Sequence, residues 1–302
     1  MVDKNIITEI SRWKEKREAV ILAHNYQPEE IQDLADILGD SLALSRKASG
    51  SDAGVIVFCG VRFMAESAKI LSPDKTVLLP RMDAGCPLAD MITAEQLRLL
   101  KEKHPRALVI CYVNSSAEVK AESDVCCTSA NALKVVQGVE ADEIIFVPDQ
   151  NLGHYVSRFT DKKIILWKGY CSVHHRIRAE HLQRVRRAHP ESVVLVHPEC
   201  RPEVVDLADE VLSTGGMLRL AKDSDAQSFI IGTEMGLIYR LQKENPGKKF
   251  YSVGQTMICV NMKKIGLPDV LRALKENQFD ISLPKEITRR ARGALDRMLQ
   301  YV

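Results

Sequence analysis

The feature that most constrains this chain is a threefold internal repeat, visible as markers that recur at nearly constant spacing. Three apolar runs end near Asn25, Asn114 and Glu199, at separations of 89 and 85 residues. Three serines in small-residue turns are separated by 88 and 84 residues: Ser41, Ser129 and Ser213. Residues 86–114 align without a gap on residues 171–199 and share eight identities, where average composition predicts about two. This period suits one small α/β unit, so we infer three such units in the chain.

Each unit alternates β-branched runs with charge-rich amphipathic stretches, a pattern that predicts a parallel sheet covered by helices. The expected strands are residues 20–25, 55–60, 76–80, 107–114, 143–148, 163–167, 192–199, 228–232 and 249–254. We therefore expect an α/β fold of three homologous three-layer αβα units with small parallel sheets, arranged with pseudo-threefold symmetry. Loops from all three units would then point to one central site. Two larger doubly wound domains are the alternative architecture.

The expected unit boundaries follow the repeat. The first unit covers residues 1–86, with the C-terminal segment 260–302 packing on it, the second covers 87–171 and the third 172–259. Because no Pro/Gly-rich or low-complexity linker separates them, we expect the units to be closely fused.

Charge and cysteine content narrow the classes of function. With 42 Lys and Arg against 40 Asp and Glu, the net charge of +2 argues against a nucleic-acid partner. Residues 1–20 are charged where a signal peptide would be apolar, and no long apolar run predicts a membrane span, so we expect a soluble, cytoplasmic protein. In that reducing compartment, the eight cysteines are expected to be packing residues, metal ligands or reactive thiols.

Three cysteines occupy equivalent positions in the repeat. Cys86, Cys171 and Cys259 are separated by 85 and 88 residues, and each follows the last expected strand of its unit. The others are expected to be small buried hydrophobes: Cys59, Cys111, Cys126, Cys127 and Cys200. Three converging thiolates suit a 4Fe-4S cluster with one iron left open as a Lewis acid. The alternatives are zinc, from the Cys171-x-x-His174 spacing, and three buried cysteines without a metal.

Polar residues gather at the expected strand ends. The first strands of the units end in the strings AHNY (23–26), YVNS (112–115) and HPEC (197–200). Near a metal, Glu199 beside His197 suits proton transfer at a carbon next to a carbonyl. We expect proton donors at His24, Tyr26 and Tyr112. The alternative for a single strand-end histidine is a structural hydrogen-bond donor.

Each unit also carries a turn rich in small polar residues before an expected helix. These turns are GDS (39–41), TSAN (128–131) and STGG (213–216). Hydroxyl and backbone N–H groups at helix N-termini bind phosphate or carboxylate, so the turns are candidate anion sites. Ordinary N-capping is the alternative.

A set of strings spread over nearly the whole chain is specific in combination: LAHNYQ (22–27), GDS (39–41), YVNS (112–115), TSAN (128–131), PDQNLG (148–153), HPEC (197–200), STGGM (213–217) and CVNMKK (259–264). In these strings the chain resembles the iron-sulfur quinolinate synthase A family. The resemblance implies three homologous α/β domains around a pseudo-threefold axis and one 4Fe-4S cluster held by Cys86, Cys171 and Cys259. It also implies condensation of iminoaspartate with dihydroxyacetone phosphate to quinolinate, with release of phosphate and two waters, in de novo NAD biosynthesis.

The resemblance further implies active-site positions. The expected catalytic residues are Glu199 as the principal base, Tyr26 and His197 as proton relays, and His174. The expected substrate-binding residues are His24, Ser41, Tyr112, Asn114, Ser129, Ser213 and Thr214. Gly85 and Tyr170 depart from the family's pattern beside two of the cysteines, and Met262 stands where some members carry the second cysteine of a C-x-x-C.

Three other functions are kept as alternatives: a three-domain 4Fe-4S reductase, a hydro-lyase acting on a small anionic substrate, and a non-enzymatic iron-sulfur sensor. A sensor predicts a nucleic-acid or partner surface, which the charge balance argues against. We expect iminoaspartate and dihydroxyacetone phosphate as partners, with functional coupling to an aspartate oxidase or dehydrogenase. We expect neither a nucleic acid nor a membrane partner.

Overall fold

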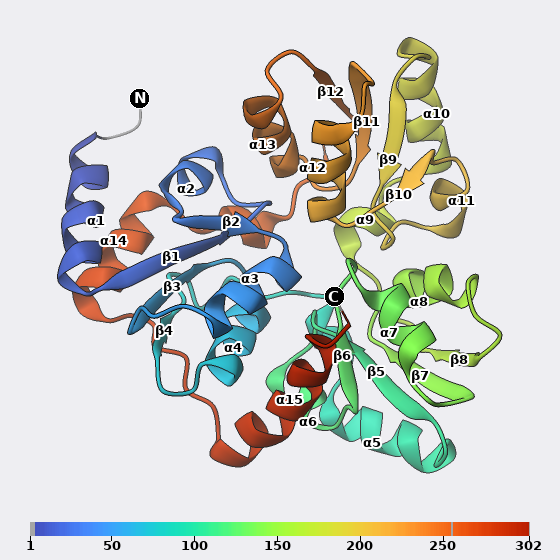
Figure 1. Cartoon of the computed structure of the whole chain (residues 1–302), viewed down its shortest axis with the longest axis horizontal. Coiled ribbons are helices and arrows are strands. Elements are labelled where there is room, and N and C mark those ends of the chain that lie inside the picture. Colours follow the sequence, from blue (N-terminus) through green and yellow to red (C-terminus); the bar gives the residue numbers. More distant parts are fainter. Residues whose placement is uncertain (1–3, 255, 302) are drawn as a thin grey trace.

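The computed structural model describes residues 4–254 and 256–301. Within them, the strands form three four-stranded parallel sheets, which confirms an α/β fold of three similar units. Each sheet has its second strand at one edge, followed in space by its first, third and fourth strands. Figure 1 shows the units around a common centre, with the first at the left, the second at the lower right and the third at the upper right.

The first unit has helices on both faces of its sheet. Its strands are β1 (Ala19–His24), β2 (Ile37–Gly39), β3 (Val55–Cys59) and β4 (Thr76–Leu78). Its helices are α1 (Lys4–Lys16), α2 (Glu29–Leu34), α3 (Ser41–Ser49) and α4 (Arg62–Leu71). Because successive residues of a strand point to opposite faces, Phe58 shares a core with α3 and α4, whereas Val57 shares one with α1. These faces give the three layers that the sequence predicts.

The second unit repeats this arrangement after a short 3-10 helix, η1 (Ala89–Met91). Its strands are β5 (Leu108–Tyr112), β6 (Val125–Cys127), β7 (Glu143–Val147) and β8 (Lys163–Leu166). Its helices are α5 (Ala94–Lys103), α6 (Ala117–Ala121), α7 (Ala132–Gly138) and α8 (Gln150–Ser157). Helix α5 begins at a capping box, in which the side chains of Thr93 and Gln96 each accept the other's backbone N–H.

The third unit again has four strands: β9 (Val193–Val196), β10 (Glu210–Val211), β11 (Ser228–Gly232) and β12 (Lys249–Ser252). Its helices are α9 (Ser172–His175), α10 (Ala179–Ala188), α11 (Pro202–Val205), α12 (Thr214–Asp223) and α13 (Gly236–Glu244). Helix α9 lies near the centre of the molecule, between the second and third units (Figure 1).

The sequence prediction missed the second strand of every unit, namely β2, β6 and β10. These strands have only two or three residues, too few for an alternating pattern to be recognised. An aspartate just before each of them stabilises this edge of the sheet. Asp36, Asp124 and Asp209 each accept a backbone N–H of the unit's first strand at 2.8 Å. Their separations of 88 and 85 residues match the repeat.

The C-terminal segment contains η2 (Val260–Lys263), α14 (Leu267–Glu276) and α15 (Lys285–Met298). Helix α14 packs against α1 and β3 of the first unit. Helix α15 contacts α4 but packs mainly against α6 and β6 of the second unit, as its position in Figure 1 shows. The segment therefore covers parts of two units, and the boundaries at residues 86, 171 and 259 stay a prediction.

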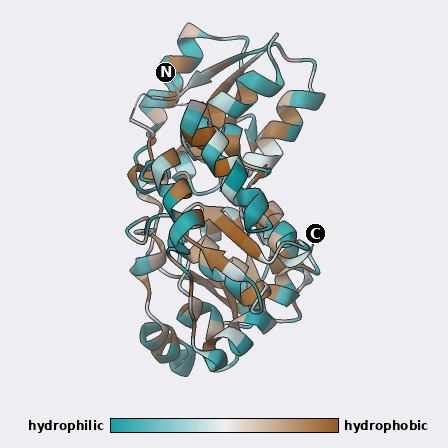
Figure 2. Cartoon of the chain, turned by 90° about the vertical axis from the view of Figure 1, so that its left-hand side faces the viewer, coloured by the Kyte–Doolittle hydropathy of each residue, from teal (hydrophilic) through white to brown (hydrophobic). Residues whose placement is uncertain are grey.

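Hydrophobic residues are concentrated in the sheets. Figure 2 shows strands in brown, the hydrophobic colour, and helices whose ribbons change between brown and teal along their length. This is the pattern of helices that bury one face on a sheet and expose the other. In the described part of the chain, helices long and apolar enough to span a bilayer are absent.

Candidate active site

A pocket lies where the three units meet, at the carboxyl ends of their strands. Residues predicted from the sequence that line it are His24, Tyr26, Ser41, Cys86, Tyr112, Asn114, Ser129, Cys171, His174, His197, Glu199, Thr214 and Cys259. His24 ends β1, Tyr112 ends β5 and His197 directly follows β9, so the first strand of each unit contributes one of them. The repeat thus brings equivalent strand ends to a single site.

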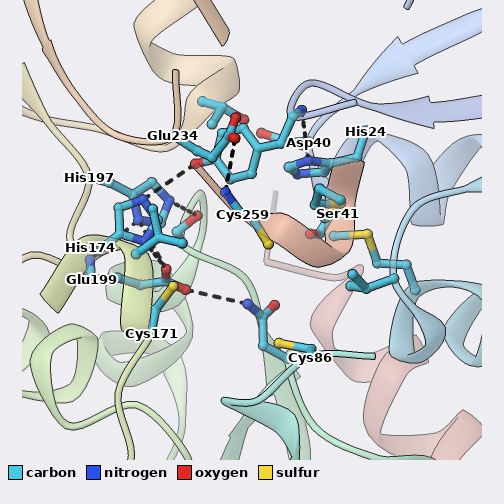
Figure 3. Close-up of a pocket in the computed structure, with 18 of the residues that line it drawn as sticks. His24, Asp40, Ser41, Cys86, Cys171, His174, His197, Glu199, Glu234 and Cys259 are labelled. Atoms are coloured by element: carbon cyan, nitrogen blue, oxygen red, sulfur yellow. Dashed lines mark hydrogen bonds and ion pairs between the residues drawn. The ribbon is translucent and has the colours of Figure 1, made fainter. Parts of the chain in front are cut away.

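The three repeat-equivalent cysteines face this pocket from the three units (Figure 3). All eight cysteines are free; Cys86, Cys171 and Cys259 are partly exposed, whereas the other five are buried, as the packing prediction requires. Burial raises the pKa of the Cys86 thiol to about 12, and the nearby Cys259 contributes to this increase. Three unpaired soft donors, one from each unit around one pocket, fit an iron-sulfur cluster.

A shared backbone hydrogen bond positions all three cysteine loops. In each unit, the third residue after the end of the third strand donates its N–H to the carbonyl two positions before the cysteine. The pairs are Arg62 to Ala84 at 2.8 Å, Gln150 to Gly169 at 2.8 Å, and Met235 to Met257 at 2.9 Å. The cysteine loops therefore share this hydrogen bond as well as their position in the repeat.

Glu199 lies at the centre of a buried polar network. One of its carboxylate oxygens, Oε2, is 2.5 Å from His174 Nδ1 and 3.7 Å from His197 Nδ1. Its other oxygen accepts a hydrogen bond from Asn114 Nδ2 at 3.4 Å. Burial alone would raise the pKa of Glu199, but the two histidines and a hydrogen bond from Tyr112 outweigh it and lower that pKa to about 2. Glu199 is thus a carboxylate at neutral pH.

A chain of side chains connects this carboxylate to Tyr26. His174 Nε2 is 2.8 Å from Thr233 Oγ1, and Thr233 Oγ1 is 2.5 Å from the Tyr26 hydroxyl. Burial raises the pKa of Tyr26 well above its ordinary value, so its hydroxyl keeps its proton. The order Glu199, His174, Thr233, Tyr26 forms a path along which protons can move.

Two further histidines are held neutral in the pocket. Burial, together with Lys263, lowers the pKa of His24 to about 3. Burial, together with His174, lowers the pKa of His197 to about 3. His197 Nε2 lies 3.1 Å from Ser129 Oγ, which fixes the ring, and the His197 ring stacks on His174 with centroids 4.4 Å apart.

The three serine turns differ in their geometry. Ser41 is the first residue of α3, and Ser129 lies in the turn before α7. Ser213 lies outside the pocket lining formed by the described residues; its Oγ caps α12 by accepting the Gly216 N–H at 3.2 Å. Its neighbour Thr214 lines the pocket and accepts a hydrogen bond from Asn25 at 2.9 Å.

Sequence reasoning missed three buried residues beside the site: Asp149, Thr233 and Glu234. Thr233 connects Tyr26 to His174, whereas Asp149 and Glu234 each accept the backbone N–H of a cysteine. A signal was present, because PDQ (148–150) and TEM (233–235) occupy the matching positions after the third strands of two units.

A second donor set overlaps the cysteine site. Cys171, His174 and Glu199 place ligand atoms within 4.8 Å of one another, a geometry that suits a single metal ion such as zinc. However, His174 already contacts Glu199 through one ring nitrogen and Thr233 through the other. A metal ion bound there would have to replace one of these contacts.

The fold and the site define a three-unit α/β protein with a polar, cysteine-lined pocket at its centre. A sequence model described as quinolinate synthetase A protein matches residues 8–300. The quinolinate synthase of Methanoregula boonei is 56% identical over 96% of both chains. Those of Thermodesulfovibrio yellowstonii and Alkaliphilus metalliredigens are 54% and 53% identical over 100% and 99% of both chains. The chain belongs to the quinolinate synthetase A family and is an enzyme of this kind.

Proposed function

We propose that this enzyme condenses iminoaspartate with dihydroxyacetone phosphate to quinolinate, releasing phosphate and two waters, as a step of NAD biosynthesis. The observation that carries this proposal is the convergence of three free cysteines and a buried carboxylate network on one pocket. The names of the relatives support the product, and hydroxyls around the pocket suit two small anionic substrates.

We assign Cys86, Cys171 and Cys259 as the ligands of one 4Fe-4S cluster. With three protein ligands, such a cluster supplies a Lewis-acidic iron that has an open coordination position. Neutral thiols must lose their protons to become ligands, so loading of the site should release protons.

Glu199 is the proposed base. It is ionised at neutral pH, and its position between His174 and His197 gives it two routes for passing on a proton. Neutral Tyr26 and Tyr112 keep their hydroxyl protons and serve as donors to substrate oxygens. His197, oriented by Ser129, relays protons next to the carboxylate.

Anion binding is proposed for the turns around the pocket. Ser41, Ser129 and Thr214 present hydroxyls to it, and α3 and α12 begin at its edge. His24 and Asn114 supply further polar contacts to the substrates. Ser213 contributes by capping α12 and through its 3.4 Å contact with Asp40, which also lines the pocket.

We further propose that an aspartate oxidase or dehydrogenase supplies the short-lived iminoaspartate. We propose the cytoplasm as the location because eight free thiols suit a reducing compartment.

The test is a product assay without oxygen. Cluster-loaded protein is incubated with dihydroxyacetone phosphate and freshly generated iminoaspartate, and quinolinate and phosphate are quantified together. We expect equal amounts of both, and none from apo-protein. A reductase would ignore both compounds without an electron donor, a hydro-lyase would release no phosphate, and a sensor would convert nothing. Absence of quinolinate from protein of verified iron content would refute the proposal.

A further inference from the structure

Two fully buried carboxylates occupy equivalent positions beside the cysteine loops. Asp149 follows β7 and Glu234 follows β11, and neither side chain has measurable exposure. Asp149 directly precedes Gln150, and Glu234 directly precedes Met235. The N–H groups of Gln150 and Met235 are the ones that donate to the cysteine loops of their units. By the same rule, the equivalent residue in the first unit is Val61, which has no acceptor in its side chain.

Asp149 binds backbone donors with both oxygens. Oδ2 accepts the N–H of Cys171 at 3.0 Å. Oδ1 accepts the N–H groups of Asn151 at 2.9 Å and Leu152 at 2.8 Å, at the start of α8. Ordinary helix capping accounts for the bonds to Oδ1 but leaves the bond to Cys171 unexplained. One side chain thus fixes the cysteine loop to the end of β7 and to α8.

Glu234 makes the equivalent contacts in the third unit. Oε1 accepts the N–H of Cys259 at 3.1 Å, a contact drawn in Figure 3, and Oε2 accepts the N–H of Gly236 at 2.7 Å. Lys263 lies 3.1 Å from Oε1 and also donates to the backbone oxygen of Tyr26. Glu234 therefore connects the cysteine loop to α13 and, through Lys263, to the first unit.

We propose that Asp149 and Glu234 are positioning residues that hold the backbones of Cys171 and Cys259 in ligand geometry before a cluster is bound. The inference rests on the cluster assigned under the proposed function. It also predicts an asymmetry: the Cys86 loop, next to Val61, depends more on the cluster for its order than the other two loops do. Buried groups that orient metal ligands typically change metal affinity by about 10- to 100-fold when they are replaced.

The variants are Asp149→Asn, Glu234→Gln and the double variant. An amide keeps the shape of the carboxylate but turns one acceptor into a donor that opposes a backbone N–H. Asp124→Asn is the matched control, since Asp124 also accepts a backbone N–H at 2.8 Å in the second unit but lies outside the described pocket lining. Asp149→Glu and Glu234→Asp keep a carboxylate at each position.

Each variant is loaded anaerobically, and three quantities are measured: iron and sulfide content, the rate of iron release to a chelator, and the cluster's midpoint potential. We expect Asp149→Asn and Glu234→Gln to release iron at least about tenfold faster than wild type, with a shifted potential. Asp124→Asn should match wild type in the rate of iron release and in the midpoint potential. Asp149→Glu and Glu234→Asp should lie closer to wild type in these two quantities than Asp149→Asn and Glu234→Gln do.

Hydrogen exchange of cluster-free wild type tests the same idea without any variant. Peptides that contain Cys171 or Cys259 should exchange more slowly than the peptide that contains Cys86. Iron release and potential equal to the Asp124→Asn control, or fastest exchange around Cys171 and Cys259, would overturn the inference. If wild type itself holds no cluster, the proposed function fails first, so the two failures are distinguishable.

Discussion

At the scale of single residues, Glu199 shows how the site controls charge. A buried carboxylate is costly unless it is paired and hydrogen-bonded. His174, His197 and Asn114 supply those contacts, so the carboxylate stays ionised beside Tyr26, which keeps its proton. Proton transfer to Glu199 is therefore possible at neutral pH.

We predict that Glu199→Gln keeps the iron content and cluster spectrum of wild type while its kcat falls by about 100-fold or more, because the amide cannot accept the proton. Glu203→Gln, an exposed neighbour on α11, is the control and should retain normal turnover. Near-normal quinolinate formation by Glu199→Gln would remove this residue from the mechanism.

The buried histidines predict how stability depends on pH. In the folded chain the pKa values of His24 and His197 are about 3, whereas their ordinary value is 6.5. As the pH falls below 6.5, the unfolded chain binds protons that the folded chain does not, so stability decreases. Each histidine contributes at most about 1.4 kcal/mol per pH unit. Lys263 and Glu199 face His24, and His174 and Glu199 face His197.

Urea unfolding of cluster-free protein between about pH 7 and about pH 5 measures how the free energy of unfolding changes with pH. We expect the free energy of unfolding to decrease toward pH 5 and the decrease to be smaller in His24→Asn and His197→Asn. Equal slopes in wild type and both variants would show that neither histidine is held neutral by the fold.

Most of the residues that line the pocket were predictable because they follow the strand ends of a repeat, whereas their roles stay a prediction. Ser213 stays a predicted anion ligand; in the structure its Oγ caps α12, and sequence alone does not distinguish these two roles. Thr233 and Glu234 match PDQ in position, but their contacts become visible only once the fold brings Tyr26 of the first unit and Cys259 of the same unit to them.

At the scale of elements, the edge strands show the limits of pattern reading. The central strands were predicted because several consecutive apolar, β-branched residues stand out. The second strands β2, β6 and β10 were not, because tertiary pairing rather than local sequence defines such short segments; the equally short β4 was predicted because it lies in the apolar run TVLL (76–79). The preceding aspartates supply a second link to the neighbouring strand, which compensates for the short ladders.

We predict that Asp36→Ala, Asp124→Ala and Asp209→Ala each lower the free energy of unfolding by about 1 to 3 kcal/mol, since each leaves a strand N–H without its acceptor. The exposed Asp52→Ala serves as the control and should change stability by less than about 0.5 kcal/mol. Chemical unfolding at equilibrium measures the free energy of unfolding of the three variants and of the control. Destabilisation no larger than that of the control would mean that these side-chain bonds contribute nothing net.

At the scale of the whole molecule, the pocket depends on contacts between units. Arg240 of α13 donates to Asn25 Oδ1 at 2.7 Å, and Lys243 lies 2.7 Å from Asp33, so the third unit is fixed against the first. The repeat predicted three units around one centre. It did not predict that α15 would cover the second unit, because the packing of a C-terminal helix without a repeat counterpart depends on which apolar surface is left uncovered.

Iron and sulfide content of the cysteine variants tests the central claim most directly, that one cluster binds where the three units meet. Each cysteine is replaced singly by serine, and the protein is loaded and analysed without oxygen. We predict about four irons per chain in wild type, Cys59→Ser and Cys127→Ser, and loss of the intact cluster in Cys86→Ser, Cys171→Ser and Cys259→Ser. A full complement of iron and sulfide in any of the last three, or its loss in Cys59→Ser or Cys127→Ser, would contradict the account.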